Sequence, residues 1–341
     1  MAAVMAMILA GGVATSPVTA ATVPALDSTA AERLLVIAPH PDDETIGAGG
    51  LIQRVLQRGG TARIVLVTAG DGYVEAVVHA TGLPRPRPSN YIAYGEQRLR
   101  ESRAAVRRLA DEQVRVQVLG FPDGGLVTLL HAHWRRTHPE RSRTTGVAAP
   151  PYPEALDPNV AYDGADLQRE LRHLMRETRP TMVVFPHPLD KHPDHHATGL
   201  FTLLAINEWV TEQVATGDPV PRLLAYLVHW PDWPPSWNLP TPPPEATRAG
   251  LDLPPSFPVP EDVRAALMLS EREVAVKGSA LAQYVSQQEV IPGVLAAFVR
   301  RSEPFVLLSA GELRETEHMI NQSLMSGRRS GRPQGSRTPN Q

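Results

Sequence analysis

The sequence predicts an α/β protein in which a mostly parallel sheet carries helices on both faces. Short apolar runs, typical of buried strands, alternate along the chain with longer amphipathic runs, typical of helices. Such alternation indicates a parallel sheet, because each helix returns the chain to the start of the next strand. Neither a repeat nor a domain boundary interrupts the pattern between residues 31 and 310. We therefore expect a single domain with long proline-rich loop insertions.

The first half of this domain is expected to contain three strands and two helices. The strands correspond to the apolar runs at residues 34–38, 62–70 and 114–120. A short helix at 49–60 would end at its closing Gly-Gly pair. A longer helix at 90–111 places Leu99, Val106 and Leu109 on one face, which is the pattern of an amphipathic helix.

The second half repeats the alternation. Further strands are expected at residues 181–187, 222–230 and 264–270, and further helices at 165–180, 196–210 and 270–287. Asp166 is the expected N-cap of the first of these helices, since its carboxylate can accept a backbone N–H. Ser270 and Glu273 form a capping box at the start of the last helix, in which each side chain can bond the backbone of the other residue.

The composition excludes several classes of protein. With 33 basic and 36 acidic side chains and no basic stripe, the chain is not expected to bind nucleic acid. The absence of cysteine excludes disulfides, thiolate metal ligands and cysteine nucleophiles. Many of the 34 prolines fall in residues 83–88, 149–158 and 230–245. Since proline disrupts helix and sheet interiors, these stretches are expected to be loops.

The two ends of the chain differ from the predicted domain. Residues 1–27 resemble a signal peptide, with an apolar stretch and the small residues "VTA" before Ala21, although no Lys or Arg precedes them. We expect export to the periplasm or the exterior, or a cytoplasmic location if this segment is only a disordered N-terminus. No stable membrane span is expected in the mature chain. Residues 326–341 are rich in Gly, Ser, Arg and Pro and are expected to form a disordered tail.

Acidic and histidine side chains follow the first and fourth expected strands. "APHPDDE" places His40, Asp42 and Asp43 after the first, and "HPDHH" places His192, Asp194 and His195 after the fourth. Ligands of open α/β sheets bind at the carboxyl ends of the strands, so the two segments are expected to meet in one crevice.

Imidazole and carboxylate groups in one crevice indicate a metal site, and Zn²⁺ is the usual ion for this combination. A catalytic zinc keeps three protein ligands and one position for water, whose pKa falls toward ~7. A neighbouring carboxylate that does not bind the metal can take the proton from this water. Each segment alone has an alternative explanation: the Asp-Asp pair could cap a helix, and "HPDHH" could form a polar turn.

The pair of motifs resembles the PIG-L/LmbE-like family of zinc-dependent N-deacetylases, over most of residues 31–310. The resemblance implies a Rossmann-like fold and removal of an N-acetyl or other N-acyl group from an amino sugar or a related amide. It implies that His40, Asp43 and His195 hold one Zn²⁺ per chain, with other divalent ions such as Fe²⁺ as alternatives. Asp42 is then the general base. His192 would stabilise the oxyanion or protonate the leaving amine, with Asp194 orienting it.

Weaker matches to the same family extend the resemblance. "RLRE" implies that Arg98 contacts substrate, although Arg98 and Glu101 could equally be an exposed helix pair. "LGFPDGG" makes Asp123 a candidate for binding sugar hydroxyls. "KGSALAQYVSQ" resembles a family helix but has Tyr284 where many members have histidine. Lys277 in this helix is expected at the surface or in packing.

Other features have simpler explanations than a second site. His131, His133 and His138 are expected in an exposed loop, because no acidic partner shares their spacing. The tryptophans at positions 230, 233 and 237 could stack on sugar rings, but we favour anchoring of the loop. The glycines of "TIGAGG" do not match a dinucleotide fingerprint.

The sequence thus predicts an enzyme with a small-molecule or glycan substrate. It leaves two alternatives open: the same metal site could hydrolyse a non-sugar amide or an ester, or the chain could be an inactive carbohydrate-binding homologue. The identity of the substrate and the oligomeric state are not indicated. The insertions at 71–90, 127–163 and 231–262 are expected to shape the pocket, because loops carry such specificity.

Overall fold

The computed structural model describes residues 32–135, 137–214 and 220–309. Within these residues a seven-stranded sheet has the order β3-β2-β1-β4-β5-β7-β6. The strands are β1 (Arg33–Ala38), β2 (Thr61–Thr68), β3 (Arg115–Phe121), β4 (Met182–Pro186), β5 (Arg222–Tyr226), β6 (Arg264–Met268) and β7 (Ser302–Leu308). The first five pair in parallel, and β7 is antiparallel to both β5 and β6. The predicted mostly parallel α/β fold is confirmed.

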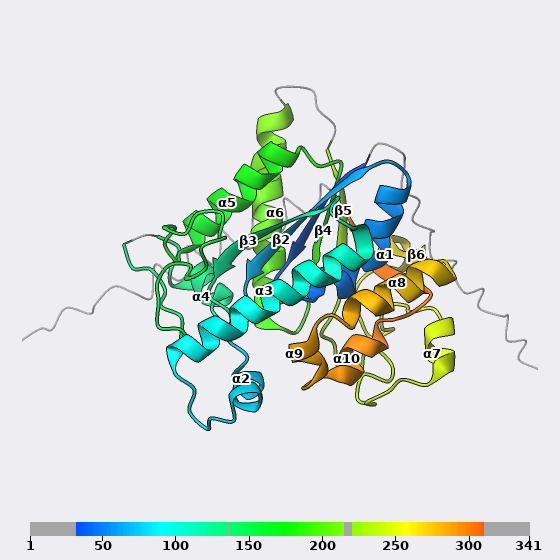
Figure 1. Cartoon of the computed structure of the whole chain (residues 1–341). Coiled ribbons are helices and arrows are strands. Elements are labelled where there is room, and N and C mark those ends of the chain that lie inside the picture. Colours follow the sequence, from blue (N-terminus) through cyan, green and yellow to red (C-terminus); the bar gives the residue numbers. More distant parts are fainter. Residues whose placement is uncertain (1–31, 136, 215–219, 310–341) are drawn as a thin grey trace, which may run out of the picture.

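Helices cover both faces of the sheet (Figure 1). On one side lie α1 (Asp43–Gln57), α3 (Pro88–Ala110) and α8 (Glu271–Leu281), which contact one another. On the other lie α4 (Leu126–His131), α5 (Gly164–Thr178) and α6 (Pro193–Val214), and α6 contacts both of the others. The short elements are α2 (Val74–Thr81), α7 (Pro244–Arg248), α9 (Val285–Gln288), α10 (Pro292–Ala297) and the 3₁₀ helix η1 (Glu261–Val263). None of the helices described in residues 32–309 combines the length and apolarity needed to cross a bilayer.

The core lies on both sides of β1 and β4, whose side chains are buried. Leu35, Val36 and Ile37 of β1 are fully buried, as are Val183 and Val184 of β4. Near-continuous apolar runs of this kind are expected of strands covered on both faces. They explain why the sequence indicated these two strands so clearly.

The strand order places a topological switch point between β1 and β4. From β1 the chain moves outward through β2 to β3, and it then returns to the other side of β1 at β4. At such a point the loops after the two strands diverge and leave a crevice at their carboxyl ends. The segments beginning at Pro39 and His187 follow these two strands directly.

Several element boundaries differ from the expected ones. The helix expected at 49–60 begins already at Asp43. Its glycines fit close packing, because a Cβ at Gly47 would lie 2.6 Å from the ring of Tyr226. Asp166 is not an N-cap: Asp163 is, and its side chain accepts the N–H of Asp166 at 2.8 Å. The capping box of Ser270 and Glu273 is present as predicted.

Other differences concern the C-terminal half. The helix expected at 270–287 is divided into α8 and α9. The strand β7 was not expected, and the strand expected at 222–230 ends at Tyr226. The expected signal segment at 1–27 and the tail at 326–341 lie outside the described residues.

Candidate active site

Asp42 occupies the sharp turn between β1 and α1. It is the N-cap residue of α1, with φ 124° and ψ −33°, a backbone conformation that is costly for a residue with a side chain. Its side chain makes no capping hydrogen bond. Instead its backbone N–H donates to Oε2 of Glu44 at 2.9 Å, which helps to hold the turn. The Asp-Asp pair thus stands at a helix start, as the alternative expected, but the carboxylate of Asp42 does not cap the helix.

Asp43 brings the two sequence motifs together. Its Oδ2 lies 3.1 Å from Nδ1 of His40 and 3.1 Å from Nε2 of His195. These residues come from the end of β1 and the first turn of α6, which are neighbours across the switch point. The three side chains are at most 10% exposed. Two imidazole nitrogens thus converge on one carboxylate oxygen in a buried position.

The second ring nitrogen of each of these imidazoles also lies near a carboxylate. Nε2 of His40 lies 3.1 Å from Oδ1 of Asp123 and 3.4 Å from Oδ2 of Asp194. Nδ1 of His195 lies 3.4 Å from Oδ2 of Asp190. Metal-binding histidines have this arrangement, in which the nitrogen remote from the ion donates to a carboxylate that fixes the ring.

The charges around this cluster would favour a bound cation. Burial opposes ionisation of Asp43, but His195 and His40 hold its pKa well below the usual range. Burial also opposes protonation of His195, but Asp43 and Asp190 raise its pKa to about 9. The carboxylates therefore create a negative potential that protons on the imidazoles balance. A divalent cation between the imidazoles could balance the same charge, and the donor set of two imidazoles and one carboxylate suits Zn²⁺.

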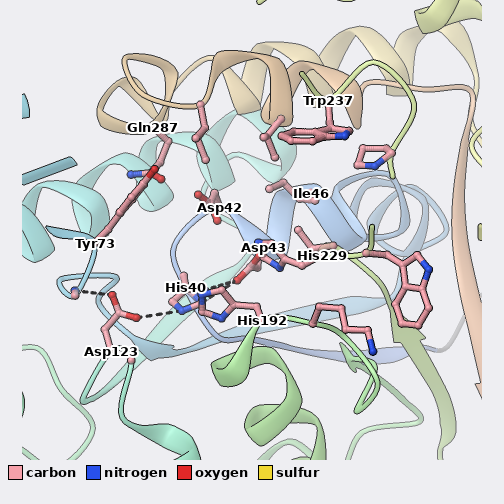
Figure 2. A pocket seen from close by; sticks show the side chains of 18 of the residues that line it. His40, Asp42, Asp43, Ile46, Tyr73, Asp123, His192, His229, Trp237 and Gln287 are labelled. Atoms are coloured by element: carbon pink, nitrogen blue, oxygen red, sulfur yellow. Dashed lines mark hydrogen bonds and ion pairs between the residues drawn. The ribbon is translucent and has the colours of Figure 1, made fainter. Parts of the chain in front are cut away.

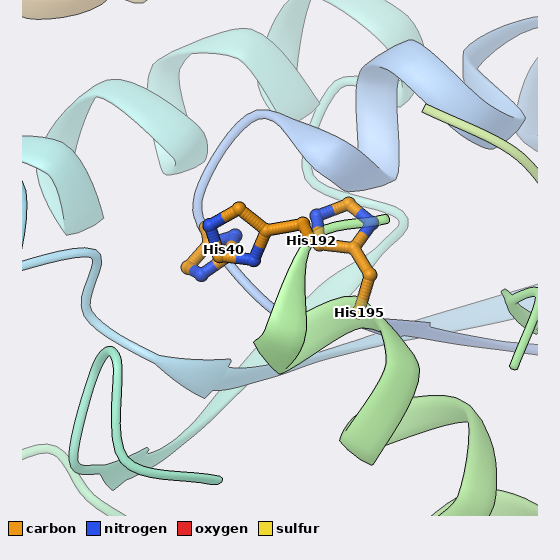
Figure 3. Close-up of side chains that lie close together, drawn as sticks. All are labelled: His40, His192 and His195. Carbon is orange, nitrogen blue, oxygen red and sulfur yellow. The ribbon is translucent and has the colours of Figure 1, made fainter. Parts of the chain in front are cut away.

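His192 is a third imidazole at this point (Figure 3). Its ring centroid lies 4.8 Å from that of His40 and 5.2 Å from that of His195. Its Nδ1 accepts the backbone N–H of Asp194 at 3.2 Å, which places the proton of a neutral ring on Nε2. Burial and the neighbouring imidazoles lower its pKa, so the ring is neutral and can donate from Nε2. The three rings offer nitrogens within 4.8 Å of one another.

Asp194 does not orient His192 through its carboxylate, which corrects the expectation. That carboxylate accepts the backbone N–H groups of Gly124 at 2.6 Å and Leu126 at 3.1 Å, and it contacts His40. Asp194 therefore ties the loop after β3 to the first turn of α6. Its contact with His192 is made by the backbone N–H alone.

Arg98 is buried and bonded to Asp42, rather than forming an exposed pair with Glu101. Its Nη2 donates to Oδ2 of Asp42 at 3.0 Å and to the carbonyl of Pro41 at 2.7 Å, and its Nη1 donates to the carbonyl of Gly70 at 3.0 Å. Gly70 has φ 65°, and a Cβ there would overlap the guanidinium. Burial raises the pKa of Asp42 to about 7, although Arg98 opposes this shift.

Asp123, which the sequence suggested only as a sugar-binding residue, lies beside the histidine and aspartate cluster. Its Oδ1 contacts His40, and its Oδ2 accepts the N–H of Gly72 at 2.5 Å. Burial opposes its ionisation, but His40 and Arg98 hold its pKa below the usual range. The side chain still lines the cavity, so the prediction that it contacts substrate is compatible with its position.

Two residues of the expected helix at 270–287 bond the first turns of α1. Tyr284 is fully buried, and its hydroxyl donates to Oε1 of Glu44 at 2.7 Å and contacts Oγ1 of Thr45. It therefore does not take the place of a pocket histidine. Lys277 is not at the surface: its Nζ donates to Glu303 at 2.7 Å and to the carbonyl of Ile46 at 2.8 Å.

Asp190 and His229 are site residues that the sequence reasoning did not include. Oδ2 of Asp190 accepts the N–H groups of Val228 at 2.9 Å and His229 at 3.0 Å, besides contacting His195. Its Oδ1 lies 3.3 Å from Nδ1 of His229. Asp190 stands between β4 and the second motif, where no sequence pattern assigns it a role. His229 follows β5 and belongs to no motif, so only the sheet order could have indicated it.

A cavity of about 620 Å³ opens beside these residues (Figure 2). Asp42, Asp43, His40, His192 and His229 line it together. By contrast, the groups of described side chains that could hold a metal ion do not include His131, His133 or His138. His133 instead pairs with Glu140 at 2.8 Å.

Comparison with known proteins identifies relatives of this chain. A family model described as PIG-L, GlcNAc-PI de-N-acetylase, matches residues 35–206. A 1D-myo-inositol 2-acetamido-2-deoxy-alpha-D-glucopyranoside deacetylase 2 from Saccharopolyspora erythraea is 26% identical over 282 residues, covering 80% of this chain and 90% of the relative. Deacetylase 1 of that organism is 31% identical over 170 residues, and there the chain spans about half of the relative, 51%. Among solved structures, the conserved protein TT1542 from Thermus thermophilus is 25% identical, covering 82% of this chain and 95% of that one, with a TM-score of 0.47.

Proposed function

The chain belongs to the PIG-L family of de-N-acetylases, and from this premise we propose that it is a zinc-dependent hydrolase that removes an N-acyl group from an amino sugar or a related amide. The family consists of hydrolases that act on N-acetyl amide bonds. Matched relatives are named as deacetylases of an acetamido sugar joined to inositol. For this chain the ion, the sugar and the acyl group are proposals.

One observation carries the proposal: Nδ1 of His40 and Nε2 of His195 each lie 3.1 Å from the same oxygen of Asp43. Asp42 lines the cavity together with His40 and Asp43. Three donors of this kind leave one position open on a tetrahedral ion. Zn²⁺ held there would act as a Lewis acid on the amide carbonyl and would supply a hydroxide near neutral pH.

The side chains around this position have separate tasks in the proposed reaction. Asp42 accepts the proton of the attacking water, and its bond from Arg98 holds the carboxylate in place. His192 donates from Nε2 to the oxygen on which negative charge develops. The amide C–N bond then breaks, the proton passes to the leaving amine, and the products are an amine and a carboxylate.

The alternative of an inactive carbohydrate-binding homologue has less support. Its expected signs would be a missing metal ligand or a missing base. His40, Asp43, His195 and Asp42 are all present and lie together. Hydrolysis of an ester or of a non-sugar amide would use the same groups, so it is distinguished by substrate profiling alone.

The proposal is tested by elemental analysis combined with a deacetylation assay. The purified protein is expected to contain one zinc per chain and to release acetate or a longer acid from N-acylated glucosamine derivatives. The variant Asp42→Ala should keep its zinc and lose turnover. Zinc-loaded protein that releases no acid from a broad panel of amides would contradict the enzymatic function.

A further inference from the structure

The cavity beside the proposed metal site has two chemically different halves (Figure 2). Tyr73, Asp123 and Gln287 lie on one side of the carboxylates and imidazoles, whereas Ile46 and Trp237 lie on the other. The first half offers charged and polar groups. The second contains the apolar side chains of Ile46 and Trp237 together with the imidazole of His229. The cavity is also lined by the apolar side chains of Val228, Trp233, Ile291 and Val294, and by Lys191.

The polar half is suited to a hydroxylated group. Asp123 fixes the loop after β2 through its 2.5 Å bond from the N–H of Gly72, which directly precedes Tyr73. Gln287 is bonded to the hydroxyl of Tyr94 at 2.8 Å through its Nε2, which leaves its Oε1 as an acceptor. Carboxylate, amide and phenol groups can bond the hydroxyls of a sugar.

One wall of the apolar half is formed by the segment from Trp230 to Trp237, which packs on α10. Gly293 of α10 lies against this segment so closely that a Cβ there would be 2.6 Å from the carbonyl oxygen of Trp237. The ring of Trp233 packs edge-on against Phe298, with centroids 5.4 Å apart. The wall is therefore part of the folded domain and is supported from behind.

Two of the indole N–H groups of this wall have partners within the protein. The indole N–H of Trp230 donates to Ser256 at 2.9 Å, and that of Trp233 donates to the carbonyl of Asp252 at 2.9 Å. The ammonium of Lys191 lies over the ring of Trp230, 4.5 Å from its centroid. A second sugar placed in this half would lose the water bound to its hydroxyls with few partners to replace it, which is costly.

The apolar half begins directly at the reacting groups. Ile46 stands on the first turn of α1, three residues after Asp43, and both side chains line the cavity. At the other end of this half, Trp237 keeps 43% of its surface exposed, which is a large apolar area for a ligand to cover. An acyl chain leaving the scissile carbonyl on this side would meet apolar surface from its first methylene onward.

We propose that the apolar half binds the acyl chain of the substrate, and that the amide cleaved carries a fatty acyl group several carbons longer than acetyl. This inference rests on the proposed function and adds the substrate class. The amino sugar occupies the polar half, and the chain lies along Ile46, Ile291 and Trp237. Water attacks the carbonyl carbon, the C–N bond breaks, and the products are the free amino sugar and a fatty acid.

The direct test compares N-acetyl-, N-butanoyl- and N-octanoylglucosamine as substrates of the zinc-loaded protein. Each methylene that becomes fully buried contributes about a factor of four in binding. Because the chain end stays partly exposed, we expect kcat/KM to be at least tenfold higher for the octanoyl than for the acetyl substrate. A ratio of one or less, or faster hydrolysis of N,N'-diacetylchitobiose than of the octanoyl substrate, would overturn the inference while leaving the amidase function standing.

Trp237 and Leu239 provide a matched pair of variants. Both are 43% exposed and they stand two residues apart, but Leu239 does not line the cavity. Trp237→Ala is expected to reduce the octanoyl-to-acetyl ratio of kcat/KM at least threefold, and Leu239→Ala should keep it within a factor of two. An unchanged ratio in Trp237→Ala contradicts the inference.

A binding measurement separates this inference from the enzymatic proposal. Octanoate and acetate, the acids released from the two substrates, are titrated against the zinc-loaded protein by calorimetry. We expect octanoate to bind at least tenfold more tightly, with the difference reduced in Trp237→Ala. Equal affinities overturn the inference. If octanoate is preferred but no amide is cleaved, the proposed function fails and the apolar subsite is retained.

Discussion

The guanidinium of Arg98 donates to Oδ2 of Asp42 at 3.0 Å, and the two side chains are only 5% and 8% exposed. The same guanidinium bonds the carbonyls of Pro41 and Gly70, so it joins the turn after β1 to the loop after β2. Asp42 is held in a costly backbone conformation with φ 124°. Arg98 therefore positions the proposed base. It also lines the cavity, so the substrate contact suggested by the sequence stays a prediction.

Replacing Arg98 should affect stability and turnover together. Breaking a buried ion pair leaves an uncompensated charge and costs about 3–5 kcal/mol. We expect Arg98→Ala to lower the free energy of unfolding by about this amount in urea titrations and to reduce kcat while zinc is retained. Arg103→Ala is the control, because Arg103 forms an exposed pair with Glu154 at 3.1 Å. Equal stability of the two variants would contradict the structural role of Arg98.

Substitutions of Asp42 and His195 should distinguish a loss of catalysis from a loss of metal binding. Loss of a general base lowers the reaction rate by a factor of roughly 10²–10⁴. We therefore expect kcat of Asp42→Asn to fall by about this factor, with its zinc retained. His195→Ala should lose both, since it removes a proposed ligand. Parallel assays of zinc content and kcat test this difference. A zinc-free Asp42→Asn protein would argue that Asp42, rather than Asp43, holds the ion.

Asp190 should influence the metal affinity without touching the ion. Its carboxylate lies 3.4 Å from Nδ1 of His195 and accepts the backbone N–H groups of His192, Val228 and His229. Removing such a partner of a ligand histidine weakens metal binding by roughly 10–100-fold. We expect this loss for Asp190→Asn in chelator competition, and none for Asp252→Asn, whose side chain is exposed. Unchanged zinc affinity in Asp190→Asn would argue against His195 as a ligand.

Glu170 should make the stability depend on pH. Both of its carboxylate oxygens are buried without a hydrogen-bond partner, and burial, followed by the charge of Asp157, raises its pKa to about 8. The folded protein therefore binds this proton more tightly than the unfolded chain does. The resulting stability is fully present at pH values below the usual glutamate pKa, and it is lost as the pH rises toward about 8.

The variant Glu170→Gln removes this titration. Its free energy of unfolding should fall less than that of the wild type between pH 5 and 8, as judged by urea titrations at each pH. Glu112→Gln, at an exposed position, should follow the wild type. If Glu170→Gln and the wild type have parallel pH profiles, Glu170 is ionised without cost in the folded protein.

The sequence could indicate most of the sheet because β1, β2 and β4 are buried on both faces and therefore appear as uninterrupted apolar runs. The strand β7 was not predicted because it contains Pro304, and proline within an apolar run argues against a central strand. Here Pro304 pairs with Ala266 of the edge strand β6. The start of α1 was not predicted because its glycines are typical of a loop. In the structure these glycines allow close packing against Tyr226 and Leu269.

Within the site, the two motifs could be found because each follows an apolar run at the carboxyl end of a strand. The partners of the motif residues could not. His229 follows β5 and reaches the site only because β5 lies beside β4. The roles of Asp194 and Arg98 depend on which atoms their side chains meet. Asp194 contacts Gly124 and Leu126, and Arg98 contacts Pro41. These contacts depend on the fold and cannot be inferred from the local sequence.

In the proposed site, His40, Asp43 and His195 together hold one ion. The most direct measurement is an X-ray structure of zinc-loaded protein with anomalous data collected at the zinc edge. We expect one strong peak about 2.0–2.2 Å from Nδ1 of His40, a carboxylate oxygen of Asp43 and Nε2 of His195. A peak held instead by Asp190 and His229, or no peak between the first and fourth strand ends, would contradict it.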